Sequence, residues 1–556
     1  MDLESYFGDY RLNNTERLVE LMRVLNDKVA PYFNPSKPFF KGSYEFSYYE
    51  YLRECKLNDK PAKPEEVLDY ISPLFQNLPN WNNPGTMINV IPPVNLVGLA
   101  SSAYSNMFNP NFVQDTFCGL LIASELEVTK YISDLAGWDW TLTHGIFTIG
   151  GLGTNLYPAK IALAKAYPEG SLKGYKDKDF FMVTSSKGHP CHQEIFGWLG
   201  LGSENCIPLP CGGDDRLIIR EAEHIISSNI ESGKIFVGLN INGGSTAEYT
   251  VDPIKEVADL RDRVVAKHGL KYVPHLHVDA VLGWAWLFFT SYDFEANPLK
   301  LPDASLAKIK NMTRRVSELR YADSFGADFH KTGFCPYISS LFIVKNRNDY
   351  FLLGKKSAVS LQEMQFGSYS PFETSLEYSR SASGSISALA TLRSLGIEGY
   401  QTLIGNLVAM TDLLRSLLAQ SNSLLVINQR TEGIATLFII KPKNYMCLSL
   451  DEILKLPKED IMEIRNYNIK FATFVLLKNK LNEISFTFTA SRTFKVPGTS
   501  IQIGAIKAYP MSVFLNENTV RILVEEILHV KSLYEASHEV IGLVDNEDAP
   551  LDATWR

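Results

Sequence analysis

Two short stretches of the sequence carry side chains suited to covalent chemistry, and the first centres on a lysine. His330-Lys331 follows a segment of small and aromatic residues and precedes the apolar run 338–344, which predicts a buried strand. Burial beside a strand disfavours the charged form of a lysine, so the pKa of its amine falls. A neutral amine can attack an aldehyde and form a Schiff base, although most lysines are solvated surface residues. Lys331 is therefore a candidate nucleophile.

The second stretch, His275-Leu276-His277-Val278-Asp279, predicts a short apolar strand that ends in a carboxylate. The carboxyl end of a strand is where an α/β sheet presents ligands. Pyridoxal phosphate needs such a pair, because a lysine carries its aldehyde and an aspartate pairs with its pyridinium nitrogen. The pair is worth up to about 4 kcal/mol at an effective dielectric constant of 20, before desolvation is subtracted. Taken alone, Asp279 is better explained as a helix N-cap or a salt-bridge partner.

A glycine-rich segment, Gly150-Gly151-Leu152-Gly153, joins a predicted strand to a predicted helix over residues 156–167. The free amides and positive dipole of a helix start, approached closely through glycine, form an anion site suited to a phosphate. An ordinary strand–helix connection explains the same residues equally well. The segment is neither a nucleotide P-loop, because the Gly-Lys-Ser/Thr ending is missing, nor a Rossmann fingerprint.

These motifs occur in the order of a known enzyme family: the glycine-rich loop, His189, Ser245-Thr246, Asp279-Ala280 and His330-Lys331. The arrangement resembles the group II pyridoxal-phosphate decarboxylases, the glutamate and aromatic amino acid decarboxylase family, from about residue 118 to 400. The resemblance implies an α/β fold of type I, as in aspartate aminotransferase. That fold has a large domain with a mainly parallel sheet flanked by helices, and a small α+β C-terminal domain. Strands and helices that alternate over residues 140–345 agree with such a sheet.

The resemblance also implies roles for individual residues. Lys331 forms the Schiff base, Asp279 pairs with the ring nitrogen, and His189 stacks on the ring and relays a proton. His189 is preferred to His192, which is interpreted as a helix-face residue, because its distance from the following Leu-Gly-x-Gly segment is that of the family. Further cofactor contacts are implied for Gly150, Gly151, Leu152, Thr246, Val281, Ser324 and His330.

Two assignments concern the segment after the lysine strand. Tyr369 lies in a polar and aromatic stretch that resembles, in position, the family's mobile catalytic loop, where a tyrosine reprotonates the product carbon. A surface or interface tyrosine is at least as good an interpretation. Arg380 matches a Ser-Arg motif of the family at the start of a long helix and could hold a substrate carboxylate through a bidentate pair. An arginine at a helix start is otherwise usually solvated.

The chain of 556 residues is too long for one compact core, and we expect three parts. They are an N-terminal helical or extended dimerisation segment over 1–110, a pyridoxal-phosphate-binding large domain over 111–395, and a small α+β domain over 396–556. The first part contains a helix-like period over Thr15–Val29 and is rich in proline and aromatic residues. In the resembled family this part packs on a second subunit, which implies a homodimer with the active site at its interface.

Composition excludes several partners. The net charge of −8 and the lack of a long basic run argue against nucleic-acid binding. No apolar run approaches about 18 residues, so no membrane span is expected, and the N-terminus has no signal-peptide pattern. Seven scattered cysteines favour a reducing compartment, and we expect a cytoplasmic protein. His189-Pro190-Cys191-His192 has metal-ligand residue types but fits no structural zinc spacing, so no metal is expected.

The sequence therefore predicts a pyridoxal-phosphate-dependent decarboxylase that acts on an amino acid through a Lys331 Schiff base and releases carbon dioxide and an amine. Fold type does not determine the reaction, so other carbon–carbon cleavage, decarboxylation-linked oxidation and transamination remain alternatives on the same cofactor. A non-catalytic binding or scaffold protein is a third possibility. The presence of both Lys331 and Asp279 argues against it, because a scaffold needs neither.

Overall fold

The structure, a computed structural model, describes residues 6–9, 11–43, 46–246, 248–354, 361–496, 499 and 501–537. A seven-stranded sheet forms its centre, in the order β2-β8-β7-β6-β5-β3-β4. Every strand except β8 runs in the same direction, since β8 pairs antiparallel with both β2 and β7. The bounds are β2 (His144–Phe147), β3 (Phe180–Ser185), β4 (Cys206–Leu209), β5 (Ile235–Asn242), β6 (His275–Asp279), β7 (Ser324–Asp328) and β8 (Ser340–Val344). The predicted mainly parallel sheet is confirmed.

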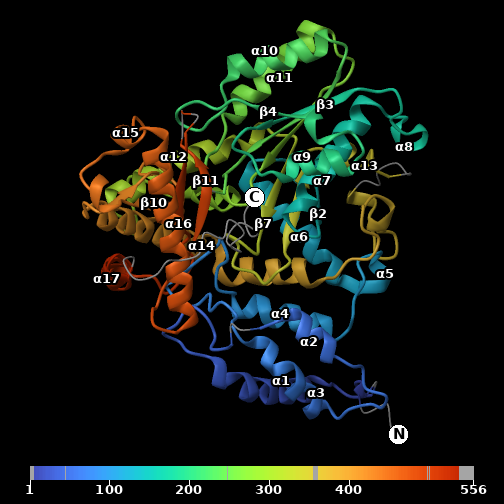
Figure 1. The fold of residues 1–556 in the computed structure, drawn as a ribbon. Helices are drawn as coiled ribbons and strands as arrows, with labels where there is room; N and C mark the ends of the chain where they lie inside the picture. Colours follow the sequence, from blue (N-terminus) through green and yellow to red (C-terminus); the bar gives the residue numbers. More distant parts are fainter. Residues whose placement is uncertain are drawn as a thin grey trace.

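Helices connect and cover these strands (Figure 1). The crossovers are needed because parallel neighbours cannot be joined by a hairpin. The helices of this region are α5 (Asp115–Cys118), α6 (Ala123–Ala136), α7 (Gly151–Ala166), α8 (Gly170–Lys173), α9 (Cys191–Trp198), α10 (Ile219–Glu231), α11 (Ile254–His268) and α12 (Asp303–Val316). The predicted start of α7 was wrong by five residues, because Gly150 adopts a left-handed φ of 97° and the helix begins directly after it.

A short helix, α13 (Arg347–Phe351), follows β8, and the side chain of Asn346 before it accepts a hydrogen bond from the Asn348 amide. An asparagine in that position is a favourable N-cap.

A second, five-stranded sheet lies in the C-terminal part, in the order β1-β11-β12-β10-β9. Its strands are β1 (Thr86–Met87), β9 (Leu424–Val426), β10 (Thr436–Ile440), β11 (Thr487–Lys495) and β12 (Gln502–Ala508), with helices α14 (Ser383–Ala419), α15 (Leu450–Ile453), α16 (Lys458–Lys480) and α17 (Glu517–Ser537). β1 comes from the N-terminal segment and pairs with β11. The predicted boundary after residue 395 falls at a kink of α14, at Gly396, and the division into three parts stays a prediction. The acidic tail 545–556 lies outside the described residues.

Helix α14 is the one described helix that is long and apolar enough to cross a membrane. Of its most apolar 18-residue window, 56% is buried inside the protein, as in a core helix of a globular fold. Length and composition alone are therefore weak grounds for a membrane span here.

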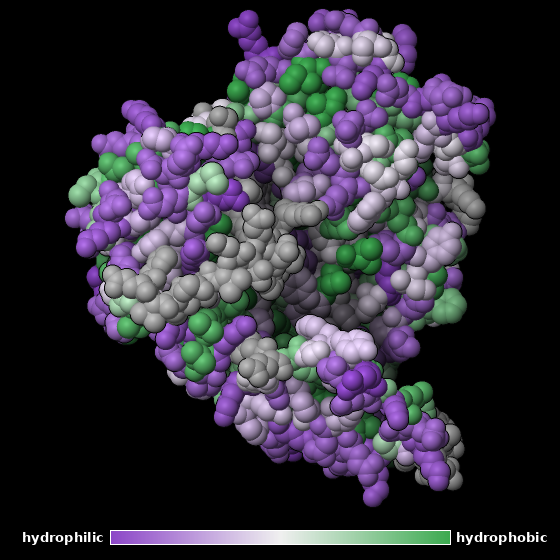
Figure 2. Space-filling view, in the orientation of Figure 1, coloured by the Kyte–Doolittle hydropathy of each residue, from purple (hydrophilic) through white to green (hydrophobic). Residues whose placement is uncertain are grey.

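The N-terminal helices pack at one side of the molecule, in blue at the bottom of Figure 1. They are α1 (Thr15–Val29), α2 (Tyr48–Glu54), α3 (Pro64–Ile71) and α4 (Leu96–Asn106), and α1 has the predicted bounds. None of the residues of α1, α2 or α3 is fully buried in the chain. Figure 2 shows apolar side chains among polar ones over this region.

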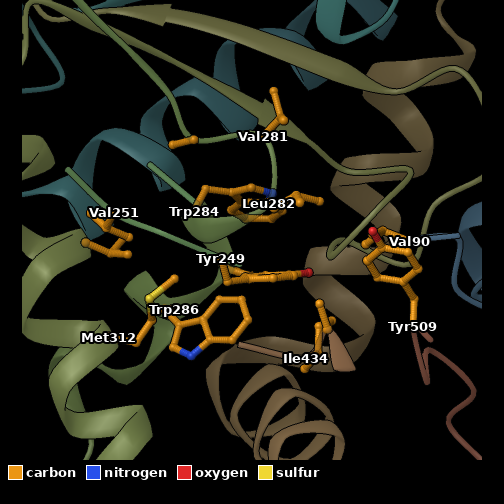
Figure 3. Close-up of a cluster of buried hydrophobic side chains, with 14 of the residues drawn as sticks. Val90, Tyr249, Val251, Val281, Leu282, Trp284, Trp286, Met312, Ile434 and Tyr509 are labelled. Carbon is orange, nitrogen blue, oxygen red and sulfur yellow. The ribbon is translucent and has the colours of Figure 1, made fainter. Parts of the chain in front are cut away.

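The most extensive hydrophobic cluster of the described residues joins the large sheet to the N-terminal segment and to the C-terminal part, and Figure 3 shows a portion of it. Tyr249, in the connection between β5 and α11, packs edge-on against Trp286, with ring centroids 5.5 Å apart. Val90 from the N-terminal segment and Tyr509 from the C-terminal part belong to the same cluster. The ring of Tyr249 also packs so closely on the backbone of Gly433 that a Cβ atom at Gly433 would lie 2.1 Å from Cγ of Tyr249.

Candidate active site

A cavity of about 360 Å³ opens at the carboxyl ends of β5, β6 and β7, beside the start of α7. Ligands of open α/β sheets bind at this edge, and the volume is in the usual range for small-molecule sites. The cavity brings together most residues that the sequence singled out: Gly150, Gly151, Leu152, His189, Thr246, Asp279, Val281, His330 and Lys331.

The first turn of α7 forms one wall of the cavity. Gly150, Gly151 and Leu152 line it, and Gly150 needs glycine because its φ is 97°. The first amides of a helix have no partner within that helix, and the dipole there attracts negative charge. This wall suits a phosphate group held by backbone amides.

Asp279 is the last residue of β6 and lines the same cavity. Its Oδ2 accepts a hydrogen bond from Asn155 Nδ2 at 3.2 Å and lies 3.6 Å from Nε2 of the buried His192. Asn240 supports both neighbours, at 2.9 Å from His192 Nδ1 and 3.1 Å from Asn155 Oδ1. Asn155 and His192 thus fix the position of the Asp279 carboxylate, and its charge remains available to a ligand.

His192 is therefore more than the helix-face residue that the sequence indicated. Burial lowers the pKa of its imidazole to about 4, and the nearby Asp279 offsets only part of that effect. A neutral His192 leaves the charge of Asp279 uncompensated, which suits a carboxylate that must pair with a cationic ring. The helical period of α9 could not show this, because the contact depends on how α9 packs on the sheet.

Lys331 follows the end of β7 and has only 26% of its side chain exposed. Its Nζ lies 2.8 Å from Oδ2 of Asp328, a carboxylate with no exposure to solvent. Burial lowers the pKa of Lys331, but the attraction of Asp328 outweighs it, so the pKa lies above its usual value. The prediction that burial leaves this amine neutral was wrong, because it did not include Asp328.

His330 and His189 flank the lysine. Nδ1–H of His330 donates to the carbonyl oxygen of Ser339 at 2.9 Å, and its ring packs against Tyr337. Burial lowers the pKa of His330, so the ring is neutral near pH 7. His189 lies in the turn between β3 and α9, exposed to solvent, where its Nδ1 accepts a hydrogen bond from the Cys191 amide. An exposed ring at the cavity wall is free to lie over a bound ligand.

The paired hydroxyls after β5 have different surroundings. Ser245 Oγ accepts a hydrogen bond from the Thr250 amide and thereby closes a turn. Thr246 lines the cavity and is only half-buried. Asn242, which the sequence did not single out, also lines the cavity, and its buried Nδ2 has no hydrogen-bond partner among the described residues. A buried donor without a partner points to a ligand atom that it could bind.

Ser324 and Arg380 lie outside the cavity, which corrects both assignments. Ser324 begins β7, at the far end from Lys331, and its hydroxyl lies 2.8 Å from both His275 Nε2 and His277 Nδ1. The Arg380 guanidinium forms a buried bidentate ion pair with Glu125 and also donates to the carbonyl oxygen of Phe147. The Ser324 hydroxyl is thus engaged by two histidines and the Arg380 guanidinium by Glu125 and Phe147, so neither group is available to a cofactor or a substrate carboxylate.

Tyr369 also lies away from the cavity of its own chain. Its backbone is held by Asp115, which accepts hydrogen bonds from the Gly367 and Tyr369 amides. Its side chain packs against the cluster of Phe112, Cys118, Ile122 and Ala382. The phenol oxygen is buried without a hydrogen-bond partner among the described residues. In this conformation Tyr369 does not line the cavity that contains Lys331 of the same chain.

The mouth of the cavity is apolar. Ile149, Tyr337 and Ile338 line it and expose 64%, 54% and 52% of their surface. Exposed large apolar side chains beside a polar cavity are typical of a ligand or partner contact.

The residues present fit pyridoxal phosphate, the cofactor that the resemblance implies. Asp279 can pair with the ring nitrogen, Lys331 can carry the aldehyde, and the α7 amides can hold the phosphate. The unpaired Nδ2 of Asn242 is a further donor in the same space. Of the features that sequence reasoning missed, Asp328 had a visible signal, since it stands three residues before Lys331.

Comparison with known protein families gives one extended match. The sequence profile described as "Pyridoxal-dependent decarboxylase conserved domain" matches residues 48–440. This range covers more than half of the chain and contains every cavity residue named above.

Solved structures share the fold at low sequence identity. The mouse protein CSAD in its apo form has a TM-score of 0.75 and 15% identity, and the match covers 93% of this chain and 99% of that one. Oryza sativa TDC, crystallised with PLP and tryptamine, has a TM-score of 0.74, 14% identity, and coverages of 95% and 99%. Catharanthus roseus tryptophan decarboxylase, in complex with L-tryptophan, has a TM-score of 0.71, 14% identity, and coverages of 95% and 100%.

Proposed function

The chain belongs to the pyridoxal-dependent decarboxylase family, and from this premise we propose that Lys331 and Asp279 are the two residues through which it holds and uses its cofactor. The protein is a pyridoxal-phosphate-dependent enzyme that decarboxylates an amino acid. The observation that supports the site is the single cavity shared by Lys331, Asp279 and the first turn of α7. We assign Lys331 the covalent attachment and the α7 amides the phosphate.

The residues around the cavity have separate tasks in this proposal. Pyridoxal phosphate, when bound, supplies a cationic ring that can accept the electron pair left by the departing carboxylate. Asp279 keeps the ring nitrogen protonated, because its negative charge is buried and held by Asn155. His189, exposed at the cavity wall, would stack on the ring and relay a proton. Val281 and Thr246 shape the remaining walls.

We further propose an uncharged substrate side chain, aromatic or aliphatic. The side chains at the mouth are apolar. Among the described residues that line the cavity, Lys331 is the one lysine or arginine, and Asp328 already pairs with it, while Asp279 adds a second carboxylate. An acidic substrate side chain would meet like charge and no free cation, which disfavours its binding.

The test is a screen of the twenty amino acids with purified protein and added pyridoxal phosphate. We expect carbon dioxide and the matching amine from aromatic or large aliphatic amino acids, at rates at least about tenfold above those with aspartate and glutamate. Product mass separates simple decarboxylation from the alternatives, since oxidation would give an aldehyde and transamination a keto acid. Carbon dioxide release mainly from an acidic amino acid would contradict the substrate proposal.

We propose that the protein works as a homodimer with the active site at the subunit interface. More than half of the exposed large apolar side chains of the described residues lie before residue 121, in about a fifth of the chain. Tyr48 and Tyr49 of α2, Leu96 of α4 and Leu120 are among the most exposed. So much apolar surface on one segment supports contact with a second copy, which would bury it.

Sedimentation should therefore give twice the 62.5 kDa mass of the chain. If Tyr369 serves the neighbouring subunit's cavity, a mixture of the Lys331→Ala and Tyr369→Phe proteins should regain about a quarter of wild-type activity. Random exchange makes half of the dimers mixed, and each mixed dimer has one site with neither lesion. A fully active monomer would contradict the interface proposal. Failure of complementation in a proven dimer, with both single variants inactive, would instead place Tyr369 in the same subunit's site as Lys331.

A cytoplasmic location remains a proposal. All seven cysteines are free in the structure, and four of them are buried. Free thiols are typical of proteins in a reducing compartment, and they support a cytoplasmic location.

A further inference from the structure

Asp328 is a fully buried carboxylate in the wall of the cavity. It ends β7 without any exposed surface and lines the cavity beside Lys331. Burying a carboxylate costs free energy of desolvation unless a cation compensates its charge, and here the proposed phosphate position is close by as well. Ser340 Oγ donates to its Oδ1 at 2.6 Å, so one oxygen is fixed and the other is directed at Lys331 Nζ.

The two side chains come from one tight turn. The Lys331 amide donates to the carbonyl oxygen of Asp328 at 3.2 Å, which holds the two residues three positions apart on the same side of the turn. Gly151 of α7 covers the carboxylate, because a Cβ atom there would lie 2.9 Å from Asp328 Oδ2. The pair is thus enclosed between the α7 start and the β7 turn.

Few other charges face this pair. Those around Lys331 are Asp279 at the end of β6, His330 and Tyr337 in the loop that follows β7, and Cys191 at the start of α9. Burial raises the pKa of the Tyr337 phenol and of the Cys191 thiol, so both are neutral, and His330 is neutral because burial lowers its pKa. Asp279 is itself a carboxylate, beside Asn155 and the neutral His192, and cannot compensate the charge of Asp328. Lys331 is therefore the cation on which Asp328 depends.

We infer that Asp328 is the counter-ion of the Lys331 nitrogen, both in the free amine and in its linkage to the cofactor, and that it keeps this nitrogen positively charged. The inference rests on the proposed attachment of the cofactor to Lys331. Asp328 acts through the lysine and is a positioning residue.

The bond changes of attachment agree with this role. The ammonium group of Lys331 would first lend one proton to water, because only the neutral amine has a lone pair that can attack the aldehyde carbon. Overall, one carbon–nitrogen double bond would form, the carbon–oxygen double bond would break, and the aldehyde oxygen would leave as water. Two of the three ammonium protons leave with that water, and the third stays on nitrogen. The positive charge would be the same before and after attachment, so Asp328 would have a cationic partner in both states. An attachment that lost the last proton would leave it without a partner.

The first test uses the wild-type protein without cofactor. Competitive acetylation across a pH series, followed by mass spectrometry of the Lys331 peptide, gives the pKa of this amine directly. We expect it above that of an ordinary lysine. A value below it would overturn the inference, whatever any variant does.

The second test compares Asp328→Asn with Asp323→Asn, which removes a carboxylate from the other end of the same strand region. In Asp328→Asn the acetylation midpoint of Lys331 should fall by about one pH unit or more, the usual effect of losing a close ion pair. In the loaded protein, the absorbance band of the protonated linkage should convert to the unprotonated band at a correspondingly lower pH. Asp323→Asn should leave both midpoints unchanged.

Unchanged midpoints in a folded Asp328→Asn protein would overturn the inference. Failure of the underlying attachment looks different, because borohydride would then fix the cofactor to another residue or to none. The acetylation profile of Lys331 does not depend on that outcome and still reports on the ion pair.

Discussion

Replacing Lys331 with alanine is expected to abolish covalent capture of pyridoxal phosphate and to lower the rate of decarboxylation by at least about 1,000-fold, as removal of a reacting group commonly does. The reason is chemical, since no other lysine lines the cavity among the described residues. Binding of cofactor through the α7 amides and Asp279 should persist. The measurement is borohydride reduction of the loaded wild-type protein, followed by peptide mapping, with the label expected on Lys331 alone.

Lys187 offers a matched control. It is also largely buried and paired with carboxylates, Asp215 at 2.9 Å and Glu248 at 3.6 Å, but it does not line the cavity. Lys187→Ala should keep the borohydride label on Lys331. A label found on another lysine in the wild-type protein, or none after cofactor addition, would remove the central assignment of the site.

Asp279→Asn is expected to lower turnover by about 100-fold or more while the free energy of unfolding changes little. A close ion pair is worth up to about 4 kcal/mol at an effective dielectric constant of 20, which corresponds to three decades in rate before the desolvation of Asp279 is subtracted. Asparagine has the same shape and keeps an oxygen that can accept from Asn155. Steady-state kinetics and urea unfolding of the same preparations measure both effects.

Asp252 provides the opposite case. This buried carboxylate accepts hydrogen bonds from the backbone amides of Leu217 and Asn242 and has no place in the cavity. Asp252→Asn should lower stability more than it lowers the turnover of the folded fraction. If Asp279→Asn behaved like Asp252→Asn, with stability lost and turnover kept, Asp279 would be a structural residue.

The sequence was sufficient to predict those site residues that lie at the end of a strand. Lys331, Asp279 and the glycines before α7 each stand beside a short apolar run, and the regular alternation of strands and helices brings such ends to one edge of the sheet. The bounds of α1 and α6 were likewise predictable, because their apolar period is local.

What could not be predicted depends on contacts across the fold. The charge state of Lys331 follows from Asp328, whose side chain is placed by Ser340 of a neighbouring strand. Arg380 was interpreted as a substrate ligand because its buried partner, Glu125, is distant in the sequence. The pairing of β1 with β11 joins the two ends of the chain through two residue pairs, too few to leave a pattern. Each of these contacts joins segments that no local period connects.

The contact between Tyr249 and Gly433 determines when, during translation, one wall of the cavity can take its final form. Thr246 stands three residues before Tyr249, so the ring anchors the loop that forms one wall of the cavity. Its packing partners Gly433 and Tyr509 leave the ribosome long after Tyr249 does. Chains fold from the N-terminus as they are made, so Tyr249 can pack on Trp286 early, but its contacts with Gly433 and Tyr509 form only when the C-terminal part has been made. This wall of the binding site is therefore completed late in synthesis, and a nascent chain is expected to bind the vitamin-derived cofactor poorly.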